Sequence, residues 1–267
     1  LGLPDFYDTR GGKNVGTGKY DLMSAGSYNG GPASLSNAYE GSGIGTVPAG
    51  YNSYEKSFMG WLKPKELKAE KVDVQALKGL AEGGDAYVIY NPERENEYYL
   101  LENRSAYRWD KALPKHGLLV LHVDYDAASW AHNTVNAQKL QLHPRFTTVP
   151  ADNLLSNQTE DNDTYPTALN NALTATSSPA LSFYTGYPVA DEGGVTGIKV
   201  HADSTVSFRF APLNTSTGIA IVGNGVAEPV GFYTLDGTYL GTKAPETSTP
   251  QVLIVKDKEG KSRKVVR

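Results

Sequence analysis

GLLVLHVD, the stretch Gly117–Asp124, is the part of the sequence that decides the fold. Its short, nearly unbroken apolar run is typical of a β-strand covered on both faces, so we expect it in the middle of a sheet. Side chains alternate between the two faces of a strand, which places His122 and Asp124 on the same face. The sequence predicts a hydrogen bond between them; a second metal site and a substrate contact are the alternatives.

The neighbouring sequence also predicts β-strands. Residues 86–90 and 97–101 are β-type runs on either side of the charged segment 91–96, a pattern that indicates a β-hairpin. Beyond it, Glu102 and Arg104 share a strand face and are expected to pair. Two more strands are predicted at 195–200 and 205–210, after a long polar loop at 153–178. These elements favour an α+β fold that is predominantly β.

One short helix is predicted, at 51–62. Asn52 is a suitable N-cap, and Glu55 three residues later completes the pattern of a capping box. Aromatic and apolar side chains recur at helical spacing, and we expect this face to pack in the core. The residues of that face are Tyr54, Phe58, Trp61 and Leu62.

Composition limits the possible functions. The chain has 267 residues, a formal net charge of −4 and no cysteine. The mild negative charge argues against nucleic acid as a main partner. Without cysteine, a metal ion would be held by His, carboxylate or carbonyl oxygen. No apolar run reaches the length of a membrane span, and the many Tyr, Gly, Ser and Thr residues favour a β-rich, extracellular architecture.

The last part of the chain is expected to form a separate small β module. After the connector 213–217, strands are predicted at 218–222, 231–235 and 252–255, with a turn at 236–237 and a basic tail at 261–267. This arrangement resembles the C-terminal sorting modules of some secreted bacterial proteins. An ordinary accessory β domain is the alternative.

The opening residues have the pattern of part of a metal site. Gly2 and Asp5 supply the G-x-x-D that can follow the H-E-x-x-H of a metzincin zinc site when Asp replaces the last His. The segment 20–24, with the sequence YDLMS, has the look of the methionine turn that lies beneath such a metal. The simpler interpretation is that Asp5 is a turn residue after Pro4 and that Met23 is an ordinary core methionine.

These segments together resemble the immune-inhibitor-A-like (M6) family of secreted metallopeptidases. The resemblance rests on GLPDFYD at 2–8, YDLMSAGS at 20–27, KSFMGWL at 56–62, EYYLLENR at 97–104 and the strand 117–124. It covers roughly residues 1–210, and Tyr20 stands where the family usually has Trp. It implies that Asp5 is the third zinc ligand, that Met23 forms the floor beneath the zinc, and that Gly2 lets the chain bend back.

The H-E-x-x-H itself is absent, since no His in the chain is followed by Glu. The resemblance therefore implies that two zinc ligands and the general-base Glu lie upstream, in a longer parent protein of which this is the C-terminal part. The sequence opens on Leu1, which also suggests a processed or truncated piece. We expect the chain alone to be inactive and to bind zinc weakly or not at all.

Other polar residues are weaker candidates. Asp8 and Asp21, with Asn14, could bind calcium in the Gly-rich loop, and so could Asp161, Asn162 and Asp163 in the later loop; solvated loops are the alternative. Glu102, Arg104, His122 and Asp124 are candidates for contacting substrate or supporting the metal ligands. The Gly-rich segment 24–50 is expected to wall the primed side of the cleft.

The sequence thus predicts three parts: the remnant of a metzincin-like catalytic domain at 1–70, a β-sandwich-like domain at 71–212 and the terminal β module at 213–267. The predicted function is that of the C-terminal part of a secreted or cell-surface bacterial zinc metalloendopeptidase. Its partners would be a protein or peptide substrate and the upstream half of the catalytic domain. The alternative is a non-catalytic, β-rich surface or binding protein on a peptidase-like scaffold.

Overall fold

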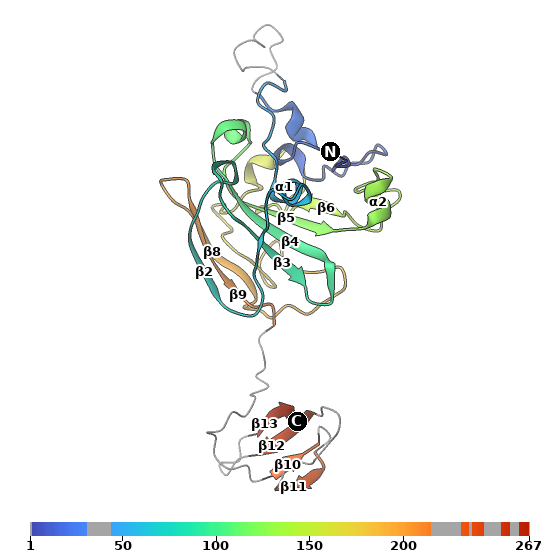
Figure 1. Ribbon diagram of the computed structural model, residues 1–267, viewed down its shortest axis with the longest axis vertical. Helices are drawn as coiled ribbons and strands as arrows, with labels where there is room; N and C mark the ends of the chain where they lie inside the picture. Colours follow the sequence, from blue (N-terminus) through green and yellow to red (C-terminus); the bar gives the residue numbers. More distant parts are fainter. Residues whose placement is uncertain are drawn as a thin grey trace. The chain divides into compact units, whose positions relative to one another are not determined.

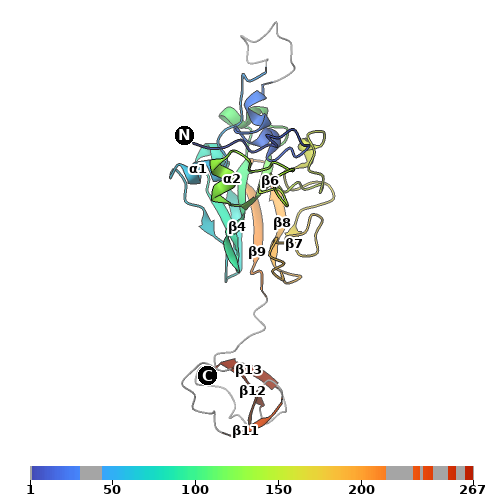
Figure 2. The ribbon, with the colours of Figure 1, turned by 90° about the vertical axis from the view of Figure 1, so that its right-hand side faces the viewer.

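The computed structural model describes residues 2–30, 44–214, 231–234, 237–242, 252–256 and 262–266. The chain divides into two compact units, Leu1–Leu213 and Asn214–Arg267. Figures 1 and 2 show both units. The sequence suggests a domain boundary at about residue 70, and this position lies inside the first unit.

The first unit contains a five-stranded sheet in the order β1-β3-β4-β5-β6. Its strands are β1 (Lys65–Glu66), β3 (Ala86–Asn91), β4 (Arg94–Arg104), β5 (Gly117–Asp124) and β6 (Phe146–Thr148). β1 pairs with β3 in parallel, and the other pairs are antiparallel. The predicted hairpin is confirmed, but its strands extend further than expected, because β4 already begins at Arg94.

A second, four-stranded sheet has the order β2-β9-β8-β7, with all neighbours antiparallel. Its strands are β2 (Val72–Leu77), β7 (Leu173–Thr174), β8 (Gly194–Val200) and β9 (Val206–Ala211). The predicted strands at 195–200 and 205–210 are thereby confirmed. The long loop expected at 153–178 is not free of regular structure, because β7 pairs with β8 at its end.

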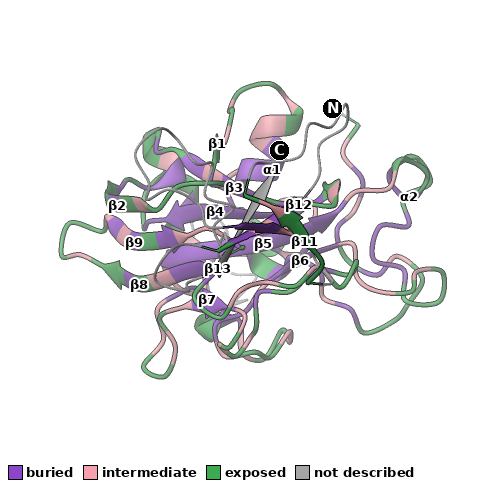
Figure 3. Ribbon diagram, turned by 90° about the horizontal axis from the view of Figure 1, so that it is seen from below, coloured by how far each residue is buried: buried purple, intermediate pink, exposed green. Residues whose placement is uncertain are grey.

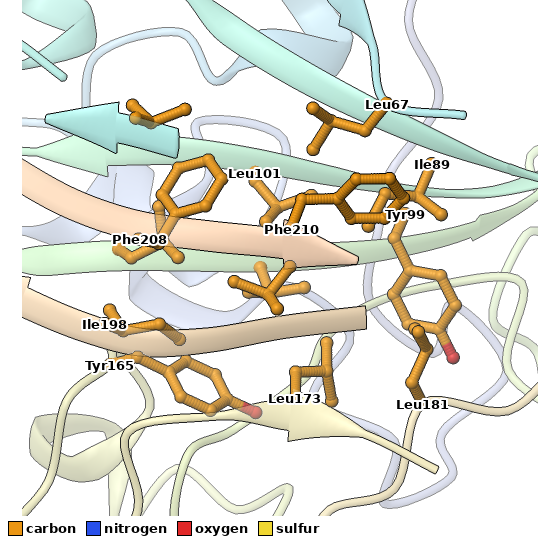
Figure 4. Close-up of a cluster of buried hydrophobic side chains, with 14 of the residues drawn as sticks. Leu67, Ile89, Tyr99, Leu101, Tyr165, Leu173, Leu181, Ile198, Phe208 and Phe210 are labelled. Atoms are coloured by element: carbon orange, nitrogen blue, oxygen red, sulfur yellow. The ribbon is translucent and has the colours of Figure 1, made fainter. Parts of the chain in front are cut away.

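The two sheets enclose the first core of the unit, as in a β-sandwich. Figure 4 shows its packing: Leu101 and Tyr99 from β4 lie opposite Phe208 and Phe210 from β9, with Ile198 alongside. Figure 3 shows the buried residues concentrated on the central strands. The prediction that the fold is predominantly β is confirmed.

β5 is buried on both faces, as its sequence predicts. Leu118 and Val120 belong to the first core, and the alternate residues Leu119, Leu121 and Val123 belong to a second core on the opposite face of the sheet. Every residue of β5 is buried. The strand therefore separates two apolar layers, which is why its sequence shows no apolar–polar alternation.

The second core is covered by the opening part of the chain and by two short helices, α1 (Ser53–Phe58) and α2 (Ala127–Ala131). In Figure 1, α1 lies over the five-stranded sheet. Among the described residues of this unit, the 3-10 helices are η1 (Gly18–Tyr20), η2 (Ala25–Tyr28), η4 (Leu80–Glu82), η5 (Arg108–Ala112) and η6 (Glu160–Asn162).

The helix prediction is correct at one end only. Asn52 and Glu55 form the expected capping box, but α1 ends at Phe58, well before residue 62. Tyr54 is buried, whereas Phe58 and Trp61 are 49% and 61% exposed. The expectation that the whole aromatic face packs in the core was wrong, because the helix is too short to carry its last turn onto the sheet.

The second unit contains a four-stranded antiparallel sheet in the order β11-β10-β12-β13. Its strands are β10 (Gly231–Tyr233), β11 (Tyr239–Gly241), β12 (Val252–Lys256) and β13 (Ser262–Val266). Phe232, Leu253 and Val255 form its small core. The segment expected to be a basic tail is therefore a paired strand, β13. The strand predicted at 218–222 lies outside the described residues.

Candidate functional site

The opening segment is anchored in the first unit through Phe6. Its N–H donates to the carbonyl oxygen of Met23 (2.9 Å), and its own carbonyl accepts from Nδ2 of Asn136 (2.9 Å). The buried ring packs edge-on against Phe146, with centroids 4.4 Å apart, and against Tyr54 at 5.6 Å. These contacts join the two segments, around residues 5 and 23, that the sequence linked to a metal site.

A pocket of about 490 Å³ lies where these segments meet. Asp5, Tyr7, Met23, Tyr28 and Glu160 are among the residues that line it. Asp5 and Tyr7 flank the anchored Phe6 in sequence, and Met23 also packs against the second core. The structure thus brings Asp5 and Met23, which are distant in sequence, to one pocket.

The carboxylate of Asp5 is held by a side chain from the end of α2. Oδ2 of Asp5 accepts from Nδ2 of Asn133 (2.8 Å), and the N–H of Asp5 donates to Oδ1 of Asn133 (2.7 Å). Asn133 has a left-handed backbone conformation, with φ 54°, that Asn tolerates better than most residues. The charge of Asp5, followed by burial, raises the pKa of Tyr7. The carboxylate is therefore fixed in orientation and half-exposed.

The second carboxylate of the pocket already has protein partners. Oε1 of Glu160 accepts from the N–H of Lys19 (2.9 Å), and Oε2 lies 3.2 Å from Nζ of the same lysine. Within the described ranges, no three His, Asp or Glu side chains are arranged to hold a metal ion. In this pocket, Asp5 can supply one ligand of the four that zinc takes in tetrahedral sites.

The residues proposed for calcium are tied into the protein separately. Oδ1 and Oδ2 of Asp8 accept from the N–H groups of Arg10 (2.9 Å) and Gln138 (3.2 Å), and Oδ1 of Asn14 accepts from Gly16 (2.9 Å). Asp21 is fully buried, and its oxygens accept from Met23 N–H (2.6 Å) and Asn52 Nδ2 (2.5 Å). These side chains mainly stabilise turns.

The later candidate group lies at η6. Asp161 and Asn162 are exposed, whereas Asp163 is buried. Burial, followed by the charge of Glu160, raises the pKa of Asp163 to about 8, so its carboxyl group is largely protonated at neutral pH.

Glu102 and Arg104 pair as predicted, with Oε1 and Nη1 3.0 Å apart, and both are fully buried. Nε and Nη2 of Arg104 donate to the two carboxylate oxygens of Asp110, at 2.8 and 2.7 Å. Nη1 and Nη2 also donate to the carbonyl oxygens of Tyr20 and Gly50 (3.0 Å each). The guanidinium therefore holds the opening part of the chain against the sheet.

The predicted hydrogen bond between His122 and Asp124 was wrong. Nε2 of His122 instead lies 3.1 Å from Oε1 of Glu97, whereas Oδ2 of Asp124 bonds to Nε2 of His143 (2.6 Å). Side chains on one strand face point in the same direction and not toward each other. His122 and Asp124 therefore each bond a residue from another segment. We call this group, Arg94, Glu97, His122, Asp124, His143, Arg145 and Tyr184, the histidine cluster.

Two arginines complete the charge balance of the histidine cluster. Nη2 of Arg94 lies 3.1 Å from Glu97 and 2.8 Å from Asp124, and Nη1 of Arg145 lies 2.9 Å from Asp124. Burial alone would raise the pKa of Glu97, but hydrogen bonds from His122, the N–H of Tyr184 and other donors outweigh it and lower that pKa to about 2. Both carboxylates are neutralised by protein groups.

Sequence reasoning missed Arg94, Glu97, His143, Arg145 and Tyr184 in this cluster. Glu97 could have been found, because the hairpin places it opposite Asp124 in the register of β4 and β5. His143, Arg145 and Tyr184 come from segments whose positions only the folded chain determines. The ring of Tyr184 stacks on His143, with centroids 3.6 Å apart.

Comparisons with protein-family models, curated proteins and solved structures find no match to this chain. Among the described residues, no helix has the length and apolar character needed to cross a membrane.

Proposed function

We propose that this chain is the C-terminal part of a zinc metalloendopeptidase resembling the immune-inhibitor-A-like family. The observation that carries the proposal is the common pocket of Asp5 and Met23. A metzincin-type site needs its third ligand and its methionine turn close together, although they are separated in sequence. Here, the hydrogen bond from Phe6 N–H to the Met23 carbonyl (2.9 Å) ties the two segments together.

The residues present fit one corner of a zinc site. The carboxylate of Asp5 is oriented by Asn133 and faces a pocket, and an Asp oxygen is a suitable zinc ligand. A hydrogen bond to a ligating carboxylate is a common supporting contact that fixes ligand orientation. On this proposal, the remaining ligands and the general base come from residues outside this chain, and bound zinc would polarise the peptide carbonyl and activate water.

The chain's own residues would then have supporting roles. Asn133 would orient Asp5, Met23 would form the apolar floor of the pocket, and Arg104 would hold the opening segment in position from the interior. Glu102 and Arg104 would act through this anchoring, because both are fully buried away from any substrate.

The sequence that precedes Leu1 in the natural gene tests the proposal first. An H-E-x-x-H motif in the residues directly before Leu1 supports it, and its absence excludes the peptidase. If the motif is present, the longer protein should cleave an unfolded protein such as casein, and Asp5→Asn should abolish both cleavage and zinc retention. Asp191→Asn, at an exposed position outside the pocket, is the matched control and should retain both.

The chain alone gives a separate expected outcome. With Asp5 as the one available ligand in the pocket, residues 1–267 should bind zinc weakly or not at all and should not cleave casein. Isothermal titration with zinc, followed by metal analysis after dialysis, measures this. Stoichiometric zinc that survives dialysis and is lost in Asp5→Asn would contradict it.

Export to the cell surface or the medium belongs to the same proposal. The support is the small antiparallel sheet of the second unit, β10–β13, whose sequence resembles bacterial sorting modules. Fusing residues 214–267 to a periplasmic reporter in a bacterium that uses such modules should bring the reporter to the cell surface. Retention of the fusion in the periplasm would argue for an ordinary accessory domain.

A further inference from the structure

An aromatic groove on the five-stranded sheet is separate from the Asp5 pocket. The sheet face that carries the second core is covered by α1 only in part, and beyond the helix lies a hollow of about 310 Å³. Val88 and Leu100 belong to its lining, and Pro64 borders it. The aromatic lining, which we call the tyrosine groove, consists of Tyr54, Phe58, Tyr90, Tyr98 and Tyr125.

The tyrosine groove exposes aromatic surface that the protein's own core leaves uncovered. Phe58 is 49% exposed and Tyr90 is 38% exposed. The rings of Tyr90 and Tyr98 meet edge-on, with centroids 5.5 Å apart, and Tyr54 stacks loosely on Phe58 at 6.4 Å. The rings therefore support one another and form a preformed surface, which reduces the entropy lost when a ligand binds.

The polar groups of the groove are mainly hydroxyl donors. Within the part of the chain that the structure describes, the hydroxyls of Tyr90, Tyr98 and Tyr125 have no hydrogen-bond partner, and Oγ of Ser57 is occupied by the Ser53 carbonyl (2.6 Å). Burial, followed by the other tyrosines, raises the pKa of Tyr98, so its hydroxyl stays protonated and can donate. The groove thus offers hydroxyl donors, and its lining contains no carboxylate or amide side chain.

This lining suits a backbone that has carbonyl acceptors and few N–H groups. Proline supplies such a backbone, since it lacks the N–H and favours the extended polyproline II conformation with exposed carbonyls. Aromatic grooves of this type recognise proline-rich segments in several domain families. A carbohydrate is less suitable, because its many hydroxyls need carboxylate or amide side chains, and none lines the groove.

The hairpin end beside Tyr90 carries negative charge, since the carboxylate of Glu95 acts on the Tyr90 hydroxyl. Glu93 and Glu95, in and just after the turn between β3 and β4, are exposed, and neither has an ion-pair partner among the described residues. Of the lysines in and around β1, Lys65 and Lys68 are paired with Asp85 (2.6 Å) and Glu66 (3.3 Å), whereas the exposed Lys63, beside Pro64, has no ion-pair partner among the described residues. A basic residue in the ligand would therefore find uncompensated carboxylates at the hairpin end.

We propose that the tyrosine groove binds a proline-rich peptide segment in the polyproline II conformation, with a basic residue directed toward Glu93 and Glu95. The proline rings lie against the tyrosine faces, and the tyrosine hydroxyls donate to the peptide carbonyls. The acidic hairpin turn selects the direction in which the segment binds.

Fluorescence anisotropy with labelled synthetic peptides tests this inference on the full chain. The probes are an oligoproline, the same peptide with one terminal arginine, and a Gly-Ser peptide of equal length. We expect the oligoproline to bind and the Gly-Ser peptide not to bind. The arginine should strengthen binding by about two- to fivefold at low salt, the size of one exposed ion pair. Double substitution Glu93→Gln/Glu95→Gln should remove that gain.

Conservative variants separate the groove from the rest of the surface. Tyr98→Phe keeps the ring and removes one donor, so it should weaken oligoproline binding about two- to tenfold. Tyr107→Phe changes an exposed tyrosine outside the groove and should have no effect. Equal binding of the Gly-Ser peptide, no oligoproline binding at millimolar concentration, unchanged affinity in both Tyr98→Phe and Tyr90→Ala, or displacement of the oligoproline by an oligosaccharide would each overturn the proposal.

Discussion

β4 carries two polar networks, one on each face and near opposite ends, and they handle buried charge in opposite ways. Near its end, Arg104 lies on the face of the second core, surrounded by the carboxylates of Asp21, Glu55, Glu102 and Asp110. Near its start, Glu97 lies on the other face in the histidine cluster, with Arg94 and Arg145 close by. The first network has more carboxylates than cations, and the second does not.

This difference in charge balance sets the protonation states. In the Arg104 network, burial raises the pKa values of Asp21 and Glu55, and Arg104 compensates this only in part. In the histidine cluster, donors and cations outweigh burial and lower the pKa of Glu97 to about 2. A buried carboxylate therefore loses or keeps its charge according to the donors around it, and depth alone does not decide.

Removing the central cation should have the largest effect on this comparison. Arg104→Met leaves the carboxylates of Glu102 and Asp110 buried without their partner, which costs about 3–5 kcal/mol of unfolding free energy. All three tryptophans, Trp61, Trp109 and Trp130, lie in the first unit, so their fluorescence during urea unfolding reports its stability.

The matched control for that variant is Arg209→Met. Arg209 is exposed and has no ion pair among the described residues, so its loss should change stability by less than about 0.5 kcal/mol. If Arg104→Met cost no more than this control, the central role of the guanidinium would be refuted.

The two networks should also give opposite pH dependences. Glu55 has a raised pKa, so above about pH 4.5 the folded state holds a proton that the unfolded state releases, and stability falls as pH rises. Glu97 has a lowered pKa, so its contribution is present above about pH 4.5 and is lost as pH falls toward 2. Urea unfolding from about pH 2 to about pH 9 measures both slopes of the unfolding free energy against pH.

Single substitutions assign these slopes to residues. Glu55→Gln should flatten the decrease on the alkaline side, and Glu97→Gln should flatten the decrease on the acid side. Each variant should leave the other slope unchanged, because the two side chains lie on opposite faces of the sheet. A flattening of the same slope by both substitutions would show that the networks are not independent.

The smallest effect is expected at the edge of the histidine cluster. His143→Phe keeps a ring against Tyr184 and removes the hydrogen bond to Asp124, whose carboxylate retains Arg145 at 2.9 Å. We expect a loss of about 0.5–1.5 kcal/mol in unfolding free energy. His132→Phe, on an exposed histidine outside the cluster, is the control. A loss above about 3 kcal/mol would mean that Asp124 depends on His143 for its charge.

Local patterns predicted what depends on neighbours in sequence. The apolar run of β5, the hairpin of β3 and β4, and the Glu102–Arg104 pair all follow from strand periodicity, and the capping box follows from the spacing of Asn52 and Glu55. The predicted burial of the helix face was wrong at Phe58 and Trp61, because periodicity cannot tell how far a helix continues or whether other segments cover it. The predicted His122–Asp124 hydrogen bond was also wrong, because strand periodicity tells which face a side chain lies on but not which partner it bonds.

The sequence alone therefore determined the hairpin of β3 and β4, the strands β5, β8 and β9, their alternation, and the motif that joins Gly2, Asp5 and Met23 to a metal-site hypothesis. Only the tertiary structure decided that Asp5 is held by Asn133, that Arg104 anchors the opening segment, and which residues form the histidine cluster and the tyrosine groove. The physical reason is one of range. Backbone periodicity is encoded within a few residues, whereas hydrogen-bond partners and uncovered surfaces depend on segments that meet only after the chain has packed.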